Sequence, residues 1–182
     1  MNIYNKEYTT IQANKDIFIA NKVSLDECKI ITQRIKEENK IHTPHMIEIT
    51  AEELLEVANT QGCCAIKNNE ELVGFIKVLS VEENEFLLLE RGSVIVKEEY
   101  RNQGWARYLV KTVLETHKTT PMYSVTNVEA IQKITQLFGQ QKYLASEIPK
   151  QILEIMEKPG KLLQNDTIYA NEVLHILIQK LG

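Results

Sequence analysis

The segment 94–107 constrains the fold of this chain more than any other. It starts with a β-branched run, passes through a charged turn and enters a stretch where Trp105, Leu109 and Val113 recur every fourth position. That spacing places apolar side chains on one face of a helix. Between strand and helix, residues 101–106 read Arg-x-x-Gly-x-Ala. The sequence therefore predicts a strand, a tight loop and a helix in succession.

The predicted loop has the chemistry of an anion site. Gly104 allows the backbone to approach a ligand closely because it carries no side chain. Free N–H groups at a helix start attract anions, and Arg101 and Arg107 add positive charge. We interpret the loop as a seat for a pyrophosphate. Gly104 alone leaves a second interpretation open, an ordinary turn whose glycine serves packing.

The length, net charge and apolar runs of the sequence limit the class of protein. A chain of 182 residues is long enough for a proper core, and we expect one domain over residues 1–182. A net charge of −4 argues against nucleic-acid binding, which usually needs a basic surface. The first residues lack the apolar core of a signal peptide, and no apolar run approaches a transmembrane span. We therefore expect neither nucleic acid nor a membrane as partner.

The cysteines indicate a reducing compartment. The chain has three cysteines, Cys28, Cys63 and Cys64, and the last two are consecutive. An odd number with two consecutive residues suits free thiols better than disulfides. No Cys or His spacing resembles a zinc site. The sequence predicts a cytoplasmic protein without a metal.

Local signals divide the chain into alternating elements. Ser24 and Thr50 each begin a capping box, Ser/Thr-x-x-Glu, which marks a helix start. Gly92 interrupts a strand, and a glycine there often marks a β-bulge. Asn127 can cap a helix. We expect helices after Ser24 and Thr50, strands at 63–67, 72–80 and 86–96, a helix at 103–117, a strand at 121–125, a helix after Asn127, a strand at 143–146, a short helix at 149–158 and a strand at 173–178. The expected apolar face of the helix after Asn127 consists of Ala130, Ile131, Ile134, Leu137 and Phe138.

This order of elements is an α+β pattern around a mixed sheet. The residues of segment 94–107 are also more specific evidence than their apolar spacing alone. Val94-Ile95-Val96, then Tyr100-Arg101, then the loop 101–106 resemble the acetyl-CoA-binding signature of the GNAT acetyltransferases. Two residues depart from the usual pattern, since Glu98 replaces a common proline and Trp105 is bulkier than the usual aliphatic residue.

The resemblance extends over roughly residues 20–180 and implies a fold and a cosubstrate. The fold is a GNAT-like mixed, mostly antiparallel sheet with helices on both faces. Its fourth and fifth strands, here 86–96 and 121–125, splay apart to hold the pantetheine arm of acetyl-CoA. The resemblance implies cofactor contacts from Val94, Ile95, Val96, Arg101, Asn102, Gln103, Gly104, Trp105, Ala106, Arg107 and Asn127.

Acetyl transfer to an amine requires a base, because a free alkylammonium is protonated at neutral pH and cannot attack. Glu90 precedes Val94 by four residues, where many family members place a catalytic glutamate, and is our candidate. The alternative is an exposed strand glutamate paired with Arg91, since a one-residue slip at the Gly92 bulge reverses the face. His42 and His45, in a loop that borders the acceptor pocket in this family, are weaker candidates.

The general acid of the family is missing from its usual place. A tyrosine within Leu-Tyr-x-x-x-Gly-Phe often protonates the leaving thiolate, and here Phe138 occupies that position. The alternatives are an unassisted thiolate, a hydroxyl from Tyr123, Ser124 or Tyr143, or poor turnover.

The resemblance implies an N-acetyltransferase that carries an acetyl group from acetyl-CoA to a primary amine of a small molecule or amino-acid-like acceptor by direct attack. Two alternatives stay open. One is a CoA-binding module without turnover, which Phe138 favours, and the other is a protein N-terminal or lysine acetyltransferase. Many relatives dimerise through C-terminal strands, so residues 173–178 form either a homodimer interface or part of the monomer's own core.

Overall fold

The computed structural model describes residues 17–41, 46, 48–83, 86–126, 128–144, 147–148 and 175–179. Among these residues the strands are β1 (Ile17–Ala20), β2 (Cys63–Asn68), β3 (Glu71–Glu83), β4 (Phe86–Val96), β5 (Met122–Thr126), β6 (Gln140–Tyr143) and β7 (His175–Gln179). The helices are α2 (Leu25–Ile41), α3 (Ala51–Thr60), α4 (Trp105–Thr116) and α5 (Glu129–Leu137), with a short 3-10 turn, η1 (Glu98–Tyr100).

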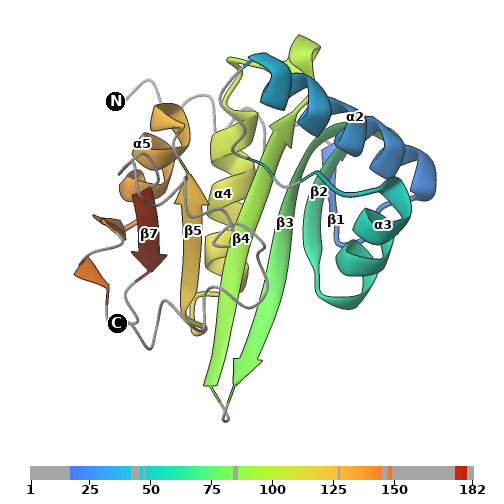
Figure 1. Cartoon of the computed structure of the whole chain (residues 1–182). Helices are drawn as coiled ribbons and strands as arrows, with labels where there is room; N and C mark the ends of the chain where they lie inside the picture. The colour runs from blue at the N-terminus through green and yellow to red at the C-terminus, as the bar shows by residue number, and fades with distance from the viewer. Residues whose placement is uncertain are drawn as a thin grey trace.

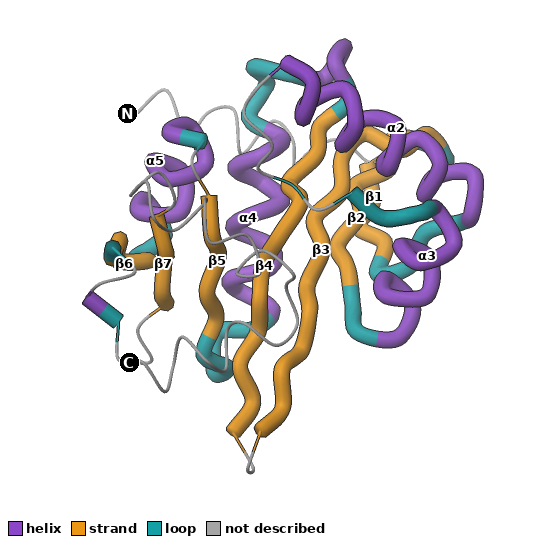
Figure 2. The backbone as a smooth tube through the Cα atoms, in the orientation of Figure 1, coloured by secondary structure: helices purple, strands orange, loops and turns teal. Residues whose placement is uncertain are grey.

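The described strands form one sheet in the order β1-β2-β3-β4-β5-β7-β6 (Figure 2). Neighbouring strands from β1 to β4 are antiparallel, β4 and β5 are parallel, and β7 is antiparallel to both β5 and β6. The predicted mixed, mostly antiparallel sheet is confirmed.

Helices cover both faces of the sheet, as predicted (Figure 1). On one face, α2 and α3 pack through Ile31, Ile35 and Leu54 against β2 and β3. On the other face, the apolar side of α4, including Leu109 and Val113, packs against the opposite side chains of the same strands. The sheet therefore lies between two apolar layers, and alternate residues of its strands contribute side chains to each layer.

The two capping boxes form and explain where the first helices start. The Ser24 N–H donates to the Glu27 carboxylate at 2.7 Å, and the Glu27 N–H donates back to the Ser24 hydroxyl at 3.2 Å. Thr50 and Glu53 make the same reciprocal pair at 2.8 and 3.1 Å. Each box satisfies two N–H groups that a helix start leaves without a partner.

The feature that positions the site is the separation of β4 from β5. The two strands pair only at Leu89–Met122 and Glu90–Tyr123, near the start of β5. Beyond Glu90, β4 stays paired with β3 as far as Val96, while β5 pairs with β7 as far as Thr126. The strands diverge from that point (Figure 1), which confirms the predicted splay.

Three expectations about the C-terminal half are corrected. The N-cap of α5 is Val128, whose N–H bonds to the Thr126 hydroxyl, rather than Asn127. The apolar face expected for α5 is only partly buried: Ile134 and Phe138 pack against the core, whereas Leu137 is 63% exposed. The strand expected at 143–146 is β6, which ends where that range begins.

The last strand lies inside the sheet. Because β7 pairs with β5 on one edge and with β6 on the other, its backbone hydrogen bonds are used within the chain. This arrangement favours the second of the two readings of residues 173–178, a place in the monomer's own sheet. Asn127, His42, His45 and the helix expected at 149–158 lie outside the described residues.

The structure also bears on the cysteines, on membrane spans and on metal sites. Cys28, Cys63 and Cys64 are buried free thiols, and burial raises the pKa of each, to about 11, 11 and 12. No described helix is both long and apolar enough to cross a membrane. In the described part of the chain, no group of His, Cys, Asp and Glu side chains is arranged to hold a metal ion.

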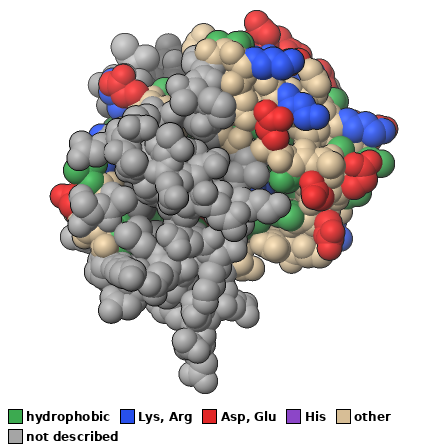
Figure 3. All heavy atoms as spheres, in the orientation of Figure 1, with side chains coloured by type: hydrophobic (Ala, Val, Ile, Leu, Met, Phe, Trp, Pro, Cys, Tyr) green, Lys and Arg blue, Asp and Glu red, His purple; other side chains and the backbone are tan. Residues whose placement is uncertain are grey.

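The surface over α2 and α3 shows how charged side chains are distributed on one face of the molecule. Over α2 and α3, acidic and basic side chains alternate rather than gathering by sign (Figure 3). Ion pairs such as Lys29–Asp26 and Arg34–Glu37 account for part of this mixture. The described part of this face therefore presents no continuous basic patch.

Candidate active site

A cavity of about 880 Å³ opens where β4 and β5 separate. Its walls come from the second half of β4, the turn before α4, the first turn of α4, the end of β5 and the start of α5. Every predicted cofactor residue lines it except two. Gln103 turns back to donate to the Glu99 carbonyl at 2.8 Å, and Asn127 is not described.

A β-bulge shapes the β4 wall. Phe75 and Lys77 of β3 pair with Ile95 and Gly92, so Ser93 and Val94 share one residue of β3 between them. Ser93 has a φ of +51°, in the left-handed region that a residue with a Cβ rarely adopts. Such strain costs about 1 kcal/mol and is typical of functional sites. The bulge confirms the interpretation of Gly92 as an interruption of the strand.

The start of α4 forms the polar end of the cavity. Gly104 is the N-cap, with a φ of +89°, and no side chain of the described residues caps the helix. The N–H groups of a helix's first turn have no acceptor within the helix, and here Trp105, Ala106 and Arg107 occupy that turn and line the cavity. The helix dipole adds partial positive charge at the same point. The geometry fits an anionic group such as a phosphate.

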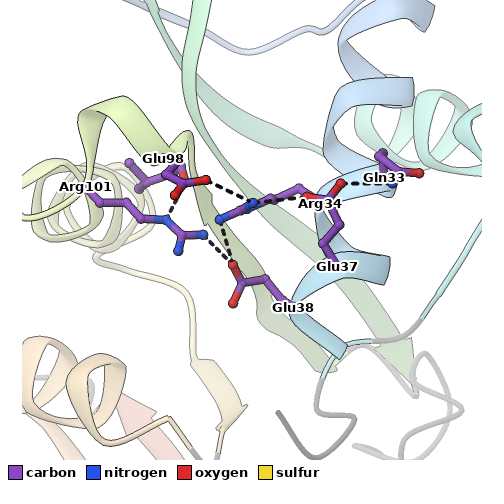
Figure 4. A network of polar contacts seen from close by, with 7 residues as sticks. Gln33, Arg34, Glu37, Glu38, Glu98 and Arg101 are labelled. Atoms are coloured by element: carbon purple, nitrogen blue, oxygen red, sulfur yellow. Dashed lines mark hydrogen bonds and ion pairs between the residues drawn. The ribbon is translucent and has the colours of Figure 1, made fainter. Parts of the chain in front are cut away.

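Arg101 is ion-paired across the cavity rim. Its guanidinium meets the carboxylate of Glu38 on α2, and its Nε donates to the Val96 carbonyl at 3.4 Å. Glu38 also accepts from Arg34 at 3.1 Å, and Arg34 reaches Glu98 at 3.7 Å (Figure 4). The network joins α2 to the turn before α4. An anion that recruits Arg101 must therefore compete with Glu38.

The remaining walls are largely apolar. Ala130, Ile131 and Ile134 of α5 line the cavity. The apolar face of α5 is therefore shared between this cavity and the core, against which Ile134 and Phe138 pack. Opposite, Trp105 packs edge-on against Tyr100 and Tyr108, with ring centroids 6.3 and 6.4 Å apart. These walls suit an extended apolar arm between the polar end and the closed end of the splay.

Glu90 lies at the closed end, buried beneath the cavity rather than lining it. It is 4% exposed, and its carboxylate accepts a hydrogen bond from the Tyr123 hydroxyl at 3.2 Å. Lys77 is the nearby charge: it pairs with Gly92 in the strand register, and a Cβ on Gly92 would lie 3.6 Å from its Cε and 3.7 Å from the Glu90 carboxylate. Because Gly92 has no side chain, Lys77 reaches across it toward Glu90.

Burial governs the titration of this pair. Burial raises the pKa of Glu90, against smaller lowering effects of Lys77 and the Tyr123 hydrogen bond. Burial lowers the pKa of Lys77, against a smaller raising effect of Glu90. Burial therefore shifts the pKa of Glu90 upward and the pKa of Lys77 downward from their ordinary values. The alternative interpretation, an exposed strand glutamate, is wrong because Glu90 is buried.

Arg91 faces the opposite side of β4 and does not pair with Glu90. It is 2% exposed, and its Nη2 donates to the Ser124 hydroxyl at 2.6 Å and to the Gln140 side-chain oxygen at 3.5 Å. Both Arg91 and Ser124 line the cavity. The suggested Glu90–Arg91 pair is therefore wrong, because adjacent residues of a strand point to opposite faces.

The hydroxyls considered as acids lie in different places. Tyr123 donates to Glu90, Ser124 accepts from Arg91, and Tyr143 donates to Gln141 at 2.8 Å. Of these, only Ser124 is among the residues that line the cavity. Phe138, at the position of the family's tyrosine, is partly buried against the apolar core beneath α4.

Sequence reasoning missed Lys77, Arg91 and Glu38 as site residues. A signal exists for the first, because Lys77 is the only charge in the otherwise apolar run 72–79. The role of Arg91 and the reach of Glu38 from α2 depend on tertiary contacts that no local pattern encodes.

Comparison with known proteins adds independent information. Residues 28–133 match the family model described as the Acetyltransferase (GNAT) family. The matched range contains β2 to β5, the loop before α4 and most of α5. No curated protein is similar enough in sequence to be matched.

Solved structures share the fold at low identity. N-acetylglutamate synthase from Neisseria gonorrhoeae, complexed with coenzyme A and N-acetylglutamate, is 13% identical over 93% of this chain, with a TM-score of 0.64. This chain spans only 36% of that protein. A GNAT-family acetyltransferase from Staphylococcus aureus Mu50 is 15% identical, covering 91% of this chain and 99% of its own, with a TM-score of 0.62. The yncA protein of Salmonella typhimurium, with its cofactor acetyl-CoA, is 14% identical over 71% of this chain and 82% of its own, with a TM-score of 0.56.

Proposed function

Because the chain belongs to the GNAT acetyltransferase family, we propose that it transfers an acetyl group from acetyl-CoA to a primary amine of a small molecule or amino-acid-like acceptor by direct attack. The observation that carries this proposal is the continuous cavity from the uncapped start of α4 to the closed end of the β4–β5 splay. One end suits phosphates and the other lies beside a buried carboxylate.

The residues fit acetyl-CoA along the length of the cavity. We assign the diphosphate to the N–H groups after Gly104, with Arg101 and Arg107 beside them. The pantetheine amides are assigned to the main chain of Val94 and Val96, in the manner of an added strand, because β4 has no partner strand on that side. When bound, acetyl-CoA supplies the thioester that the amine attacks.

Glu90 is the proposed base. A general base works best when its pKa lies near the working pH, and burial raises the pKa of Glu90 in that direction. Because Glu90 is buried, proton transfer from the amine would pass through water. The N–H groups of Ser93 and Val94, which share one β3 residue at the bulge, are proposed to donate to the thioester oxygen.

The acceptor class rests on the likeness to N-acetylglutamate synthase, a structure that contains N-acetylglutamate. This likeness supports an amino-acid-like acceptor for the present chain. The cytoplasm, with its acetyl-CoA and reduced thiols, is the proposed compartment, consistent with the three free cysteines.

Calorimetry with acetyl-CoA, CoA and dephospho-CoA tests the cosubstrate. We expect the first two to bind, and a panel of amines and amino acids to release free thiol from acetyl-CoA. Absence of any CoA affinity in the unmodified protein would refute the proposal.

A CoA-binding module without turnover is the second candidate. Phe138 in place of the family's tyrosine favours it, since phenylalanine has no proton to give. The thiol-release assay separates the two: CoA binding without amine-dependent release would identify the module.

A further inference from the structure

Arg91 is a buried cation whose charge no described residue neutralises. It is 2% exposed, and its partners, Ser124 and Gln140, are neutral. Among the residues that the structure describes, none accepts a hydrogen bond from its Nε. In the part of the chain that the structure describes, no carboxylate forms an ion pair with it. A buried unpaired charge is costly unless something compensates for it, so this arrangement points to an anion that completes the site.

The position of Arg91 identifies which end of the cavity that anion occupies. Arg91 follows Glu90, the last β4 residue paired with β5, and Ser124 follows Tyr123, the last β5 residue paired with β4. Both side chains therefore lie at the closed end of the splay, beside the Gly92–Val94 bulge. If phosphates occupy the α4 end, as proposed above, an extended arm places its sulfur at this closed end.

The reaction creates a negative charge there. The amine nitrogen forms a bond to the acetyl carbon, and its proton passes toward Glu90. The carbon–sulfur bond then breaks, and its electron pair stays on sulfur as a thiolate. We propose that Arg91, whose side chain lines the cavity, binds this departing CoA thiolate through its guanidinium charge, with Ser124 and Gln140 holding the guanidinium in place. The inference depends on the acetyl-transfer function proposed above.

Arg91 would replace the family's missing acid by a different means. Phe138 has no proton, Tyr123 donates to Glu90 on the other face, and Tyr143 donates to Gln141. Burial lowers the pKa of Arg91 only to about 10, so the guanidinium stays charged at neutral pH. It therefore stabilises the thiolate by charge and hydrogen bonding and leaves protonation of the thiol to solvent.

The direct test is the titration of CoA's own thiol while it is bound, followed by ultraviolet thiolate absorbance. A free thiol of this kind has a pKa of about 8–9. We expect binding to the unmodified protein to lower that value by about one unit, a tenfold preference for the thiolate. Arg91→Met should remove the shift, and Arg91→Lys should restore part of it.

Desulfo-CoA, which lacks the thiol, is the matched ligand. Arg91→Met should bind desulfo-CoA as the unmodified protein does, which also shows that the variant is folded. Its kcat for acetyl transfer should fall about tenfold or more with KM for acetyl-CoA little changed.

Two results would overturn the inference. One is a bound thiol in the unmodified protein that titrates as free CoA does, a measurement that needs no variant. The other is an unchanged shift in an Arg91→Met protein that still binds desulfo-CoA. Either would leave acetyl transfer intact, whereas a protein that binds no CoA would refute both proposals.

Discussion

Glu90 and Lys77 are two opposite charges buried on the same face of the sheet, and each biases the titration of the other. A base must lose its proton to act, so turnover should rise with pH through the pKa of Glu90. Since burial raises that pKa, the rise should lie above the ordinary glutamate value of about 4.3. Glu90→Gln should lower kcat by about 10²–10⁴ and leave acetyl-CoA affinity unchanged. A pH profile of kcat, with calorimetry, measures both.

The variant Lys77→Met tests the direction in which Lys77 shifts the pKa of Glu90. Lys77 lowers the pKa of Glu90, so its removal should move the acid limb of the profile to higher pH. Glu115→Gln, at an exposed ion pair with Lys111 near the end of α4, is the control and should leave the profile unchanged. A limb that stays in place in Lys77→Met, or unchanged turnover in Glu90→Gln, would remove Glu90 from the mechanism.

Gly104 and Gly139 offer a matched pair at the same scale. Both have a left-handed backbone, with φ of +89° and +87°, so a leucine at either position is strained by a similar amount. Only Gly104 lines the cavity, whereas a Cβ on Gly139 meets no atom within 4 Å. We expect Gly104→Leu to abolish measurable CoA binding in calorimetry and Gly139→Leu to retain it. Equal losses would mean that backbone strain, rather than a blocked phosphate site, explains the effect.

At the scale of elements, α2 acts on the cofactor site through one carboxylate. Glu38 holds Arg101 by an ion pair and lines the cavity, so it would compete with the phosphates that we propose to bind there. Glu38→Gln should tighten CoA binding by up to about fivefold, since such partly exposed pairs are worth up to about 1 kcal/mol. The gain should shrink as salt increases.

Glu37→Gln is the control for this prediction. Glu37 lies on the same helix and pairs with Arg34, but it does not line the cavity. Calorimetry at low and high ionic strength should show no change for it. Weaker CoA binding in Glu38→Gln would mean that Glu38 positions Arg101 for the ligand instead of competing with it.

Elements whose limits depend on neighbouring residues were predictable from the sequence. The boxes at Ser24 and Thr50 fix two helix starts, and Gly92 marks the bulge, because each device works within a few residues. The division of the apolar face of α5 was not predictable, since Ala130 and Ile131 line the cavity while Phe138 packs against the core. The orientation of Glu90 and Arg91 required the register of three strands, and that register is set by contacts far apart in sequence.

At the scale of the whole molecule, the sheet consists of two parts joined at a narrow seam. Strands β1 to β4 form one part and β5, β7 and β6 the other, and the seam has only the pairs Leu89–Met122 and Glu90–Tyr123. A ligand whose arm hydrogen-bonds along β4 within the splay would also contact β5 and α5, which line the same cavity. Binding should therefore couple the two parts of the sheet.

Thermal unfolding and hydrogen exchange test this coupling. A ligand at 100 times its Kd stabilises the native state by about 2.7 kcal/mol, which for a protein of this size raises Tm by about 5–11 °C. CoA should also slow exchange at the amides of β5, because the arm closes the splay against them. The nucleotide part of CoA without its pantetheine arm is the control. It should protect the first turn of α4 and leave β5 exchanging as before. If the nucleotide alone protected β5 as fully as CoA does, the arm would not lie between the two strands.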